Sequence, residues 1–160
     1  MLSVTILCVG KLKETFYKEG VEEYRKRLSP FCKVEVVELP EKRLPERCSA
    51  GDVQGALEQE GAWILEKIPQ GAAVIPLCIE GELCSSEKLA ERMQNMMLRG
   101  VSRLCFILGG SVGLSQTVKD RGSWKLSMSP MTFPHHLARV MLMEQLYRGF
   151  QILSGGKYHK

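Results

Sequence analysis

Long apolar runs are absent from this sequence of 160 residues. No stretch approaches the roughly 20 uncharged apolar residues that a transmembrane helix needs, so we predict no membrane-spanning segment. The first ten residues lack the basic segment of a secretory signal, which predicts that they form a strand. Internal repeats and low-complexity tracts are also missing. Because 44% of residues are hydrophobic and 25% are charged, we predict one globular domain over residues 1–160.

Metal-binding cysteine patterns are missing as well. The six cysteines form no CxxC pair and no Cys/His spacing suited to zinc, so we predict no metal site. Cys8, Cys78 and Cys105 lie inside apolar runs, where a free cysteine behaves as a small hydrophobic residue. Together with the absent secretory signal, this predicts free thiols in a reducing compartment and therefore a cytoplasmic protein.

Positive charge is concentrated near the end of the chain. Residues 121–160 contain six Lys or Arg against a single Glu, whereas the first 120 residues contain 16 bases and 17 acids. All three histidines also lie in the last 40 residues. This asymmetry is consistent either with an anionic partner at the C-terminal end or with a basic face in contact with solvent.

Predicted strands and helices alternate along the chain, which indicates an α/β protein with a mostly parallel sheet flanked by helices. The run 102–108 is almost wholly apolar, so we expect a strand buried on both faces. Pro76 predicts an edge position or a bend in its strand. Strands are predicted over 2–9, 32–39, 72–79, 102–108 and 124–127, and helices over 13–28, 51–67, 85–98, 115–120 and 135–153.

Two loops fall at the carboxyl ends of predicted strands, where ligands of such sheets bind. The glycine loop at 109–113 matches neither GxGxxG nor GxxxxGK[ST] and lacks a P-loop lysine, which argues against phosphate binding. Its glycines are consistent with a tight turn or with close approach of a ligand to the backbone. The loop at 127–133 is apolar and rich in methionine, so a ligand ring, a partner subunit or neighbouring core must cover it.

The predicted last helix is apolar on nearly all sides, which suggests that a second chain covers about half of it. Glu144 and Arg148 are four residues apart and can pair across one turn, as many exposed pairs do. For His135, in the first turn, a capping or core role is favoured over catalysis. The tail that contains Tyr158, His159 and Lys160 follows two glycines. Such an end usually frays, but its side chains could also contact RNA.

Four segments, taken in order, resemble the bacterial large-subunit rRNA methyltransferase H family. They read FILGGSVGLS at 106–115, LSMSPMTFPH at 126–135, EQLYRGF at 144–150 and KYHK at 157–160. The resemblance extends from the first strand to the last residue, and the ordered set is much more specific than any one segment.

The resemblance implies a SPOUT-type fold with a C-terminal trefoil knot and the use of S-adenosylmethionine. It implies methylation at N3 of a pseudouridine in a 23S rRNA stem-loop, on the assembled ribosome, by a homodimer. That donor has no phosphate, which agrees with the missing P-loop lysine. By position, the family's cofactor-binding residues correspond to Leu77, Gly109, Met128, Ser129, Pro130, Met131, Thr132 and Phe133, and its catalytic residues to Glu144, Arg148, Tyr158 and His159.

The implied reaction requires the weakly acidic N3 to lose its proton. His159 or Glu144 could accept it, while Arg148 holds a phosphate or a developing charge. Two other functions remain open at this point: a ribosome-associated factor without catalysis, and a flavodoxin-like nucleotide-binding module. Affinity for S-adenosylmethionine distinguishes the methyltransferase from both.

Overall fold

The computed structural model describes all residues from 1 to 160, and strands and helices alternate along the chain. In chain order the elements are β1 (Ser3–Val9), α1 (Thr15–Leu28), β2 (Lys33–Leu39), α2 (Ala50–Lys67), β3 (Ala73–Leu83), α3 (Ser86–Leu98), β4 (Arg103–Leu108), α4 (Gln116–Arg121), β5 (Leu126–Ser127) and α5 (His135–Leu153).

The five strands form one sheet in the order β2-β1-β4-β3-β5, and every neighbouring pair is parallel. This confirms the predicted α/β architecture with a parallel sheet. β4 lies at the centre, between β1 and β3, and all of its residues except the first are buried. The nearly uninterrupted apolar sequence of this strand is therefore explained by helices on both of its faces.

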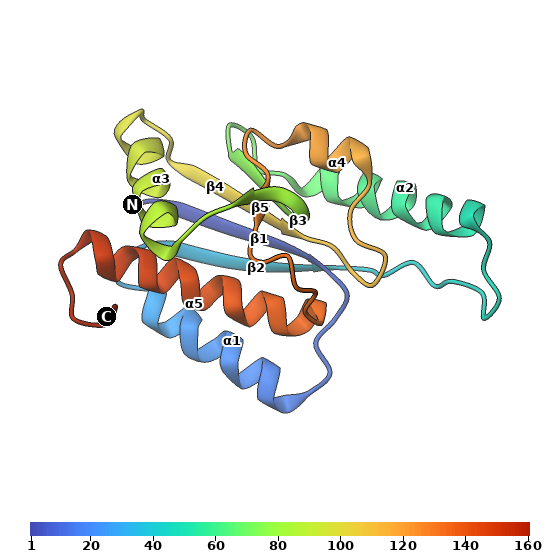
Figure 1. The fold of residues 1–160 in the computed structure, drawn as a ribbon, viewed down its shortest axis with the longest axis horizontal. Helices are drawn as coiled ribbons and strands as arrows, with labels where there is room; N and C mark the ends of the chain where they lie inside the picture. Colours follow the sequence, from blue (N-terminus) through green and yellow to red (C-terminus); the bar gives the residue numbers. More distant parts are fainter.

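Helices cover the two faces of the sheet in separate groups. On β4, Leu104, Phe106 and Leu108 pack into the core that includes residues of α1, α3 and α5, whereas Cys105 and Ile107 pack into the core that includes residues of α2 and α4. Figure 1 shows α1 and α5 side by side on one face of the sheet, with α2 and α4 away from them. The alternation of side chains along the strand places its apolar residues in both cores.

Serine side chains mark where three of the helices begin. Ser49 opens α2 through a capping box with Asp52, in which each side chain accepts a hydrogen bond from the backbone N–H of the other. Ser85 accepts from the amide of Lys88 at the start of α3, and Ser115 caps α4 in the same way. These caps satisfy amides that have no partner within the helix.

Pro76 marks a change in strand pairing, in agreement with the expectation from sequence. It is the last residue of β3 paired with β4, and from Leu77 onward β3 pairs only with the short β5. The strand itself continues to Leu83, four residues beyond the predicted end. The predicted fifth strand is shorter than expected and consists of two residues.

Helix α5 is largely buried by its own chain, because it packs against α1 and α3 over the sheet. Leu137, Val140 and Met141 stay half-buried, so the expectation of a second chain on this helix remains a prediction. The trefoil knot likewise remains an implication of the resemblance. None of the helices combines the length and apolar character needed to cross a membrane.

Candidate functional site

A pocket of about 270 Å³ opens at the carboxyl ends of β3 and β4. Leu77 and Leu108 contribute its wall from the sheet, and the first turn of α5 closes one side with His135 and Ala138. Both predicted ligand loops line it. Of the eight residues predicted for the cofactor, seven line this pocket: Leu77, Gly109, Met128, Ser129, Met131, Thr132 and Phe133.

Pro130 is the predicted cofactor residue that the structure leaves out of the pocket lining; it is exposed. It lies between residues that fix the shape of the loop. The Ser129 side chain accepts a hydrogen bond from the Met131 amide at 2.9 Å, and the Ser129 carbonyl accepts one from the Ser127 hydroxyl at 3.2 Å. Pro130 therefore lies on the outside of a hydrogen-bonded loop whose neighbouring residues line the pocket.

The glycine loop forms the tight turn that its sequence allowed, and its glycines also border the pocket. A Cβ atom on Gly109 would lie 2.4 Å from the carbonyl oxygen of Gly113, so the turn excludes any larger residue there. Gly113 has a φ of +81°, a conformation that other residues rarely adopt. Gly109, Gly110 and Gly113 all line the pocket as well. The tight turn thus places bare backbone where a ligand can approach.

The chemistry of the pocket suits the implied donor. Its apolar walls, such as Leu77 and Met128, can cover an adenine ring, and the glycine backbone offers hydrogen-bonding groups at its edge. The one lysine in the lining, Lys119, forms an ion pair with Glu80. Its charge is therefore already neutralised and is not free to bind a phosphate group. A ligand that has no phosphate and contains an adenosyl group fits this lining.

The four predicted catalytic residues meet elsewhere on α5, around Arg148. The Arg148 guanidinium donates to the Glu144 carboxylate at 2.7 Å and lies 3.1 Å from His159 Nδ1. It also stacks on the Tyr158 ring, 4.8 Å from its centroid. Hydrogen bonding to Glu144 raises the pKa of Arg148, so its positive charge is secure. The structure therefore brings together all four residues.

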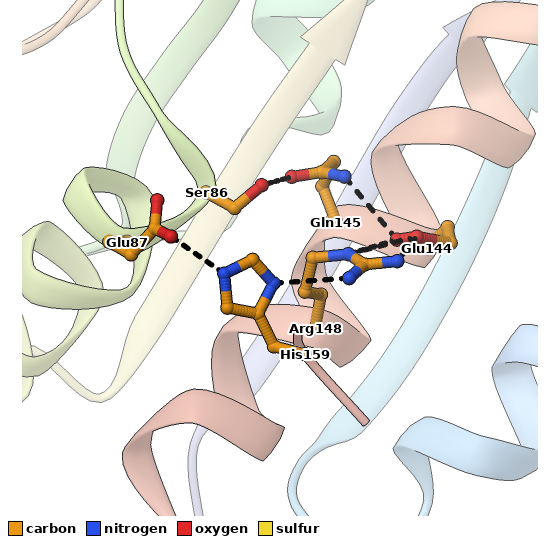
Figure 2. A network of polar contacts seen from close by, with 6 residues as sticks. All are labelled: Ser86, Glu87, Glu144, Gln145, Arg148 and His159. Carbon is orange, nitrogen blue, oxygen red and sulfur yellow. Dashed lines mark hydrogen bonds and ion pairs between the residues drawn. The ribbon is translucent and has the colours of Figure 1, made fainter. Parts of the chain in front are cut away.

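The C-terminal tail is held in place by this network, as Figure 2 shows. His159 Nε2 lies 2.6 Å from Glu87 at the start of α3, and Tyr158 packs edge-on against Tyr147 at 4.8 Å between ring centroids. Contact with His159 lowers the pKa of Glu87. Next to them, the Ser86 hydroxyl donates to Gln145 at 2.6 Å. The tail is docked on α3 and α5, so the expectation that it frays is not met.

Within one chain, the pocket and the Arg148 network stay apart. His135 lines the pocket at the first residue of α5, whereas Glu144 and Arg148 follow nine and thirteen residues later. At a rise of about 1.5 Å per residue, they lie about 14 and 20 Å further along the helix axis. The predicted site residues thus form two clusters instead of one centre.

Sequence reasoning gave no role to Arg139, which the structure buries almost completely at 1% side-chain exposure. It donates to Glu38 at 2.7 Å and to the Gly10 carbonyl at 3.0 Å. Burial favours a raised pKa for Glu38, but the Leu12 amide and Arg139 outweigh it and lower the pKa. Through these two hydrogen bonds, Arg139 connects the N-terminal part of α5 to the carboxyl ends of β1 and β2. The only signal in the sequence was a cation flanked by apolar residues in this helix.

Comparisons with known proteins identify relatives of the whole chain. A family model described as "Predicted SPOUT methyltransferase" matches residues 2–159. Two proteins named "Ribosomal RNA large subunit methyltransferase H", from Alkaliphilus oremlandii (strain OhILAs) and Clostridioides difficile (strain 630), are 45% identical over 159 residues, which is 99% of this chain and 100% of theirs. A solved structure of a probable methylase family protein from Haemophilus influenzae Rd KW20 aligns with 100% of this chain and 72% of its own at a TM-score of 0.55 and 12% identity, which shows a shared fold.

Proposed function

The chain belongs to the SPOUT methyltransferase family, and from this membership we propose that it is a ribosomal RNA methyltransferase that uses S-adenosylmethionine. Its proposed target is N3 of a pseudouridine in a 23S rRNA stem-loop, on the assembled ribosome in the cytoplasm. The observation that carries the proposal is the convergence on one pocket of seven residues that the family resemblance had assigned to the cofactor.

Bound in this pocket, S-adenosylmethionine would supply a methyl group on a positively charged sulfur, which is already activated for transfer. The protein therefore acts mainly by holding the two reactants in line. Leu77 and Met128 provide apolar contact, and the backbone of Gly109 permits close approach. The location at the carboxyl ends of parallel strands is where ligands of such sheets generally bind.

We assign RNA contact to the Arg148 network. The guanidinium is held by Glu144 and stacked on Tyr158, so its orientation is fixed before a phosphate arrives. The network lies about 14–20 Å along α5 from the pocket of the same chain. A homodimer in which each copy brings its network to the pocket of the other would unite the two clusters, and the half-buried Leu137 and Met141 leave apolar surface for such a contact.

Two measurements test the proposal together. Calorimetry with S-adenosylmethionine should detect binding, and mass spectrometry of 23S rRNA should detect the new methyl group after incubation with ribosomes from a strain that lacks this methylation. Leu77→Ala should weaken donor binding about 5- to 30-fold, because a buried apolar contact is worth about 1–2 kcal/mol.

The matched control is Leu83→Ala, on the same strand but outside the pocket and exposed. It should bind the donor like the unaltered protein, and melting curves of both variants separate a loss of folding from a loss of contact. Ribosome binding without any donor affinity would instead identify a non-catalytic ribosome-associated factor and end the proposal.

A further inference from the structure

A second, strongly polar pocket lies beside the donor pocket. It has a volume of about 730 Å³ and sits at the carboxyl ends of β1 and β2. Its lining includes Lys11, Lys13, Glu14 and Glu41, and only one of its ten residues is hydrophobic. The sheet order places β1 next to β4, so both pockets open along the same edge of the sheet. The polar pocket is thus larger than the donor pocket and adjoins it.

His135 is the one side chain that lines both pockets. Its Nε2 atom is buried, has no hydrogen-bond partner, and lies 3.9 Å from Glu41 Oε2. Because Nε2 is closed off, Nδ1 is the ring nitrogen left for a ligand. A proton on Nε2, on the side of this carboxylate, would leave Nδ1 as a hydrogen-bond acceptor.

Glu41 is itself held in position. Its Oε1 atom accepts a hydrogen bond of 2.9 Å from the Ser111 hydroxyl, which belongs to the glycine loop of the donor pocket. The loop after β2 is thereby connected to the donor site. At 3.9 Å the Glu41 carboxylate does not hydrogen-bond the ring, but its negative charge opposes the loss of a proton from the imidazolium.

We propose that the polar pocket receives the base of the acceptor nucleotide and that His135 accepts the proton of its reacting N–H group. This inference rests on the methyl transfer proposed above. As the N–H bond breaks, the proton passes to His135 Nδ1. The nitrogen electron pair forms the new N–CH₃ bond while the S–CH₃ bond breaks, and the electron pair of that bond stays on sulfur, which becomes neutral.

The two acceptors expected from sequence are already engaged in this chain. Both ring nitrogens of His159 contact a partner, Arg148 on one side and Glu87 on the other. The Glu144 carboxylate is paired with Arg148. His135 differs from both, because it stands at the boundary of the donor pocket and is not paired with a cation.

Burial, more than the neighbouring charges, lowers the pKa of His135 and favours its neutral ring. Burial is the main cause that lowers its pKa, and the charges of His136 and Arg139 lower it further. Glu41, from the loop after β2, and Glu14, at the start of α1, act in the opposite direction without reversing the shift. A neutral imidazole at neutral pH is ready to take up a proton.

His135→Gln tests the role, with methylation-deficient ribosomes as substrate and single-turnover rates as the readout. At neutral pH the rate should fall about 10²- to 10⁴-fold, the usual contribution of a general base. It should then recover by about tenfold per pH unit as hydroxide removes the substrate proton, whereas the unaltered protein stays level over the same range. Affinity for S-adenosylmethionine, measured by calorimetry, should stay within about threefold.

His136→Gln is the matched control. It removes the neighbouring imidazole, which lines the polar pocket but not the donor pocket. Whatever its effect on the rate, its pH profile should keep the shape of the unaltered protein. NMR titration of the protein without donor gives a separate readout: Glu41→Gln should lower the pKa of His135 still further, because a negative charge beside the ring is lost.

The outcomes are distinct. A His135→Gln protein with an unchanged pH profile, or one that loses donor affinity in the same proportion as rate, would overturn the assignment and make His135 a structural residue. Failure of the unaltered protein to methylate the ribosomes would instead refute the proposed function itself.

Discussion

The buried pair of Arg139 and Glu38 leads to an asymmetric prediction about stability. Glu38→Gln leaves a guanidinium that is 1% exposed without its carboxylate, which should destabilise the fold by about 3–5 kcal/mol. Arg139→Met leaves Glu38, whose side chain is 35% exposed and still bonded to the Leu12 amide. Because that carboxylate remains partly hydrated and bonded, the loss should be smaller, about 2 kcal/mol. Urea unfolding followed by tryptophan fluorescence measures both values.

The same pair predicts a pH dependence. The folded-state pKa of Glu38 is lowered, so the stability that it contributes is present above the unfolded pKa of about 4.3 and is lost as pH falls through the folded value. Arg139→Met should lose part of this acid dependence, since the cation that lowers the pKa is gone. Equal destabilisation by the two variants, together with unchanged acid profiles, would refute the reasoning about the pair.

Two further predictions concern the glycine loop and the tail. Gly109→Ala should lower stability by about 1–3 kcal/mol, because its methyl group meets the Gly113 carbonyl, whereas Gly55→Ala, in open space on α2, should raise it by about 0.5–1 kcal/mol; thermal melts compare them. His159→Ala should reduce methyl transfer to ribosomes more than it reduces affinity for S-adenosylmethionine, and an equal loss of both would contradict a role in handling RNA.

Local sequence patterns were sufficient for the sheet, and the family resemblance supplied most of the residues that line the pocket. The apolar run of β4 predicted a strand buried on both faces because that pattern lies within a single element. The two loops could be placed together because the carboxyl ends of parallel strands share one edge. Seven of the eight residues carried over from the family then met in one pocket.

The polar contacts could not be predicted in this way. Arg139 and Glu38 are 101 residues apart, and His159 and Glu87 are 72 apart. Charged side chains have no periodicity that identifies a distant partner, so the docked tail and the second pocket emerged only from the folded chain. From sequence, His135 was expected to act as a cap or core residue. Its proximity to Glu41 depends on the folded chain and cannot be seen from its neighbours in sequence.

The order of the strands has a consequence for how the chain folds during synthesis. β1 and β2 can pair as soon as the first 39 residues have emerged. The second edge of β1 and one edge of β3 have no partner until β4, which lies between them and ends at Leu108, has been synthesised. Until then each exposes an open, apolar edge that can pair with another nascent chain. Because these neighbours are so distant in sequence, we expect slow folding and a window of aggregation that closes only when the central strand is inserted.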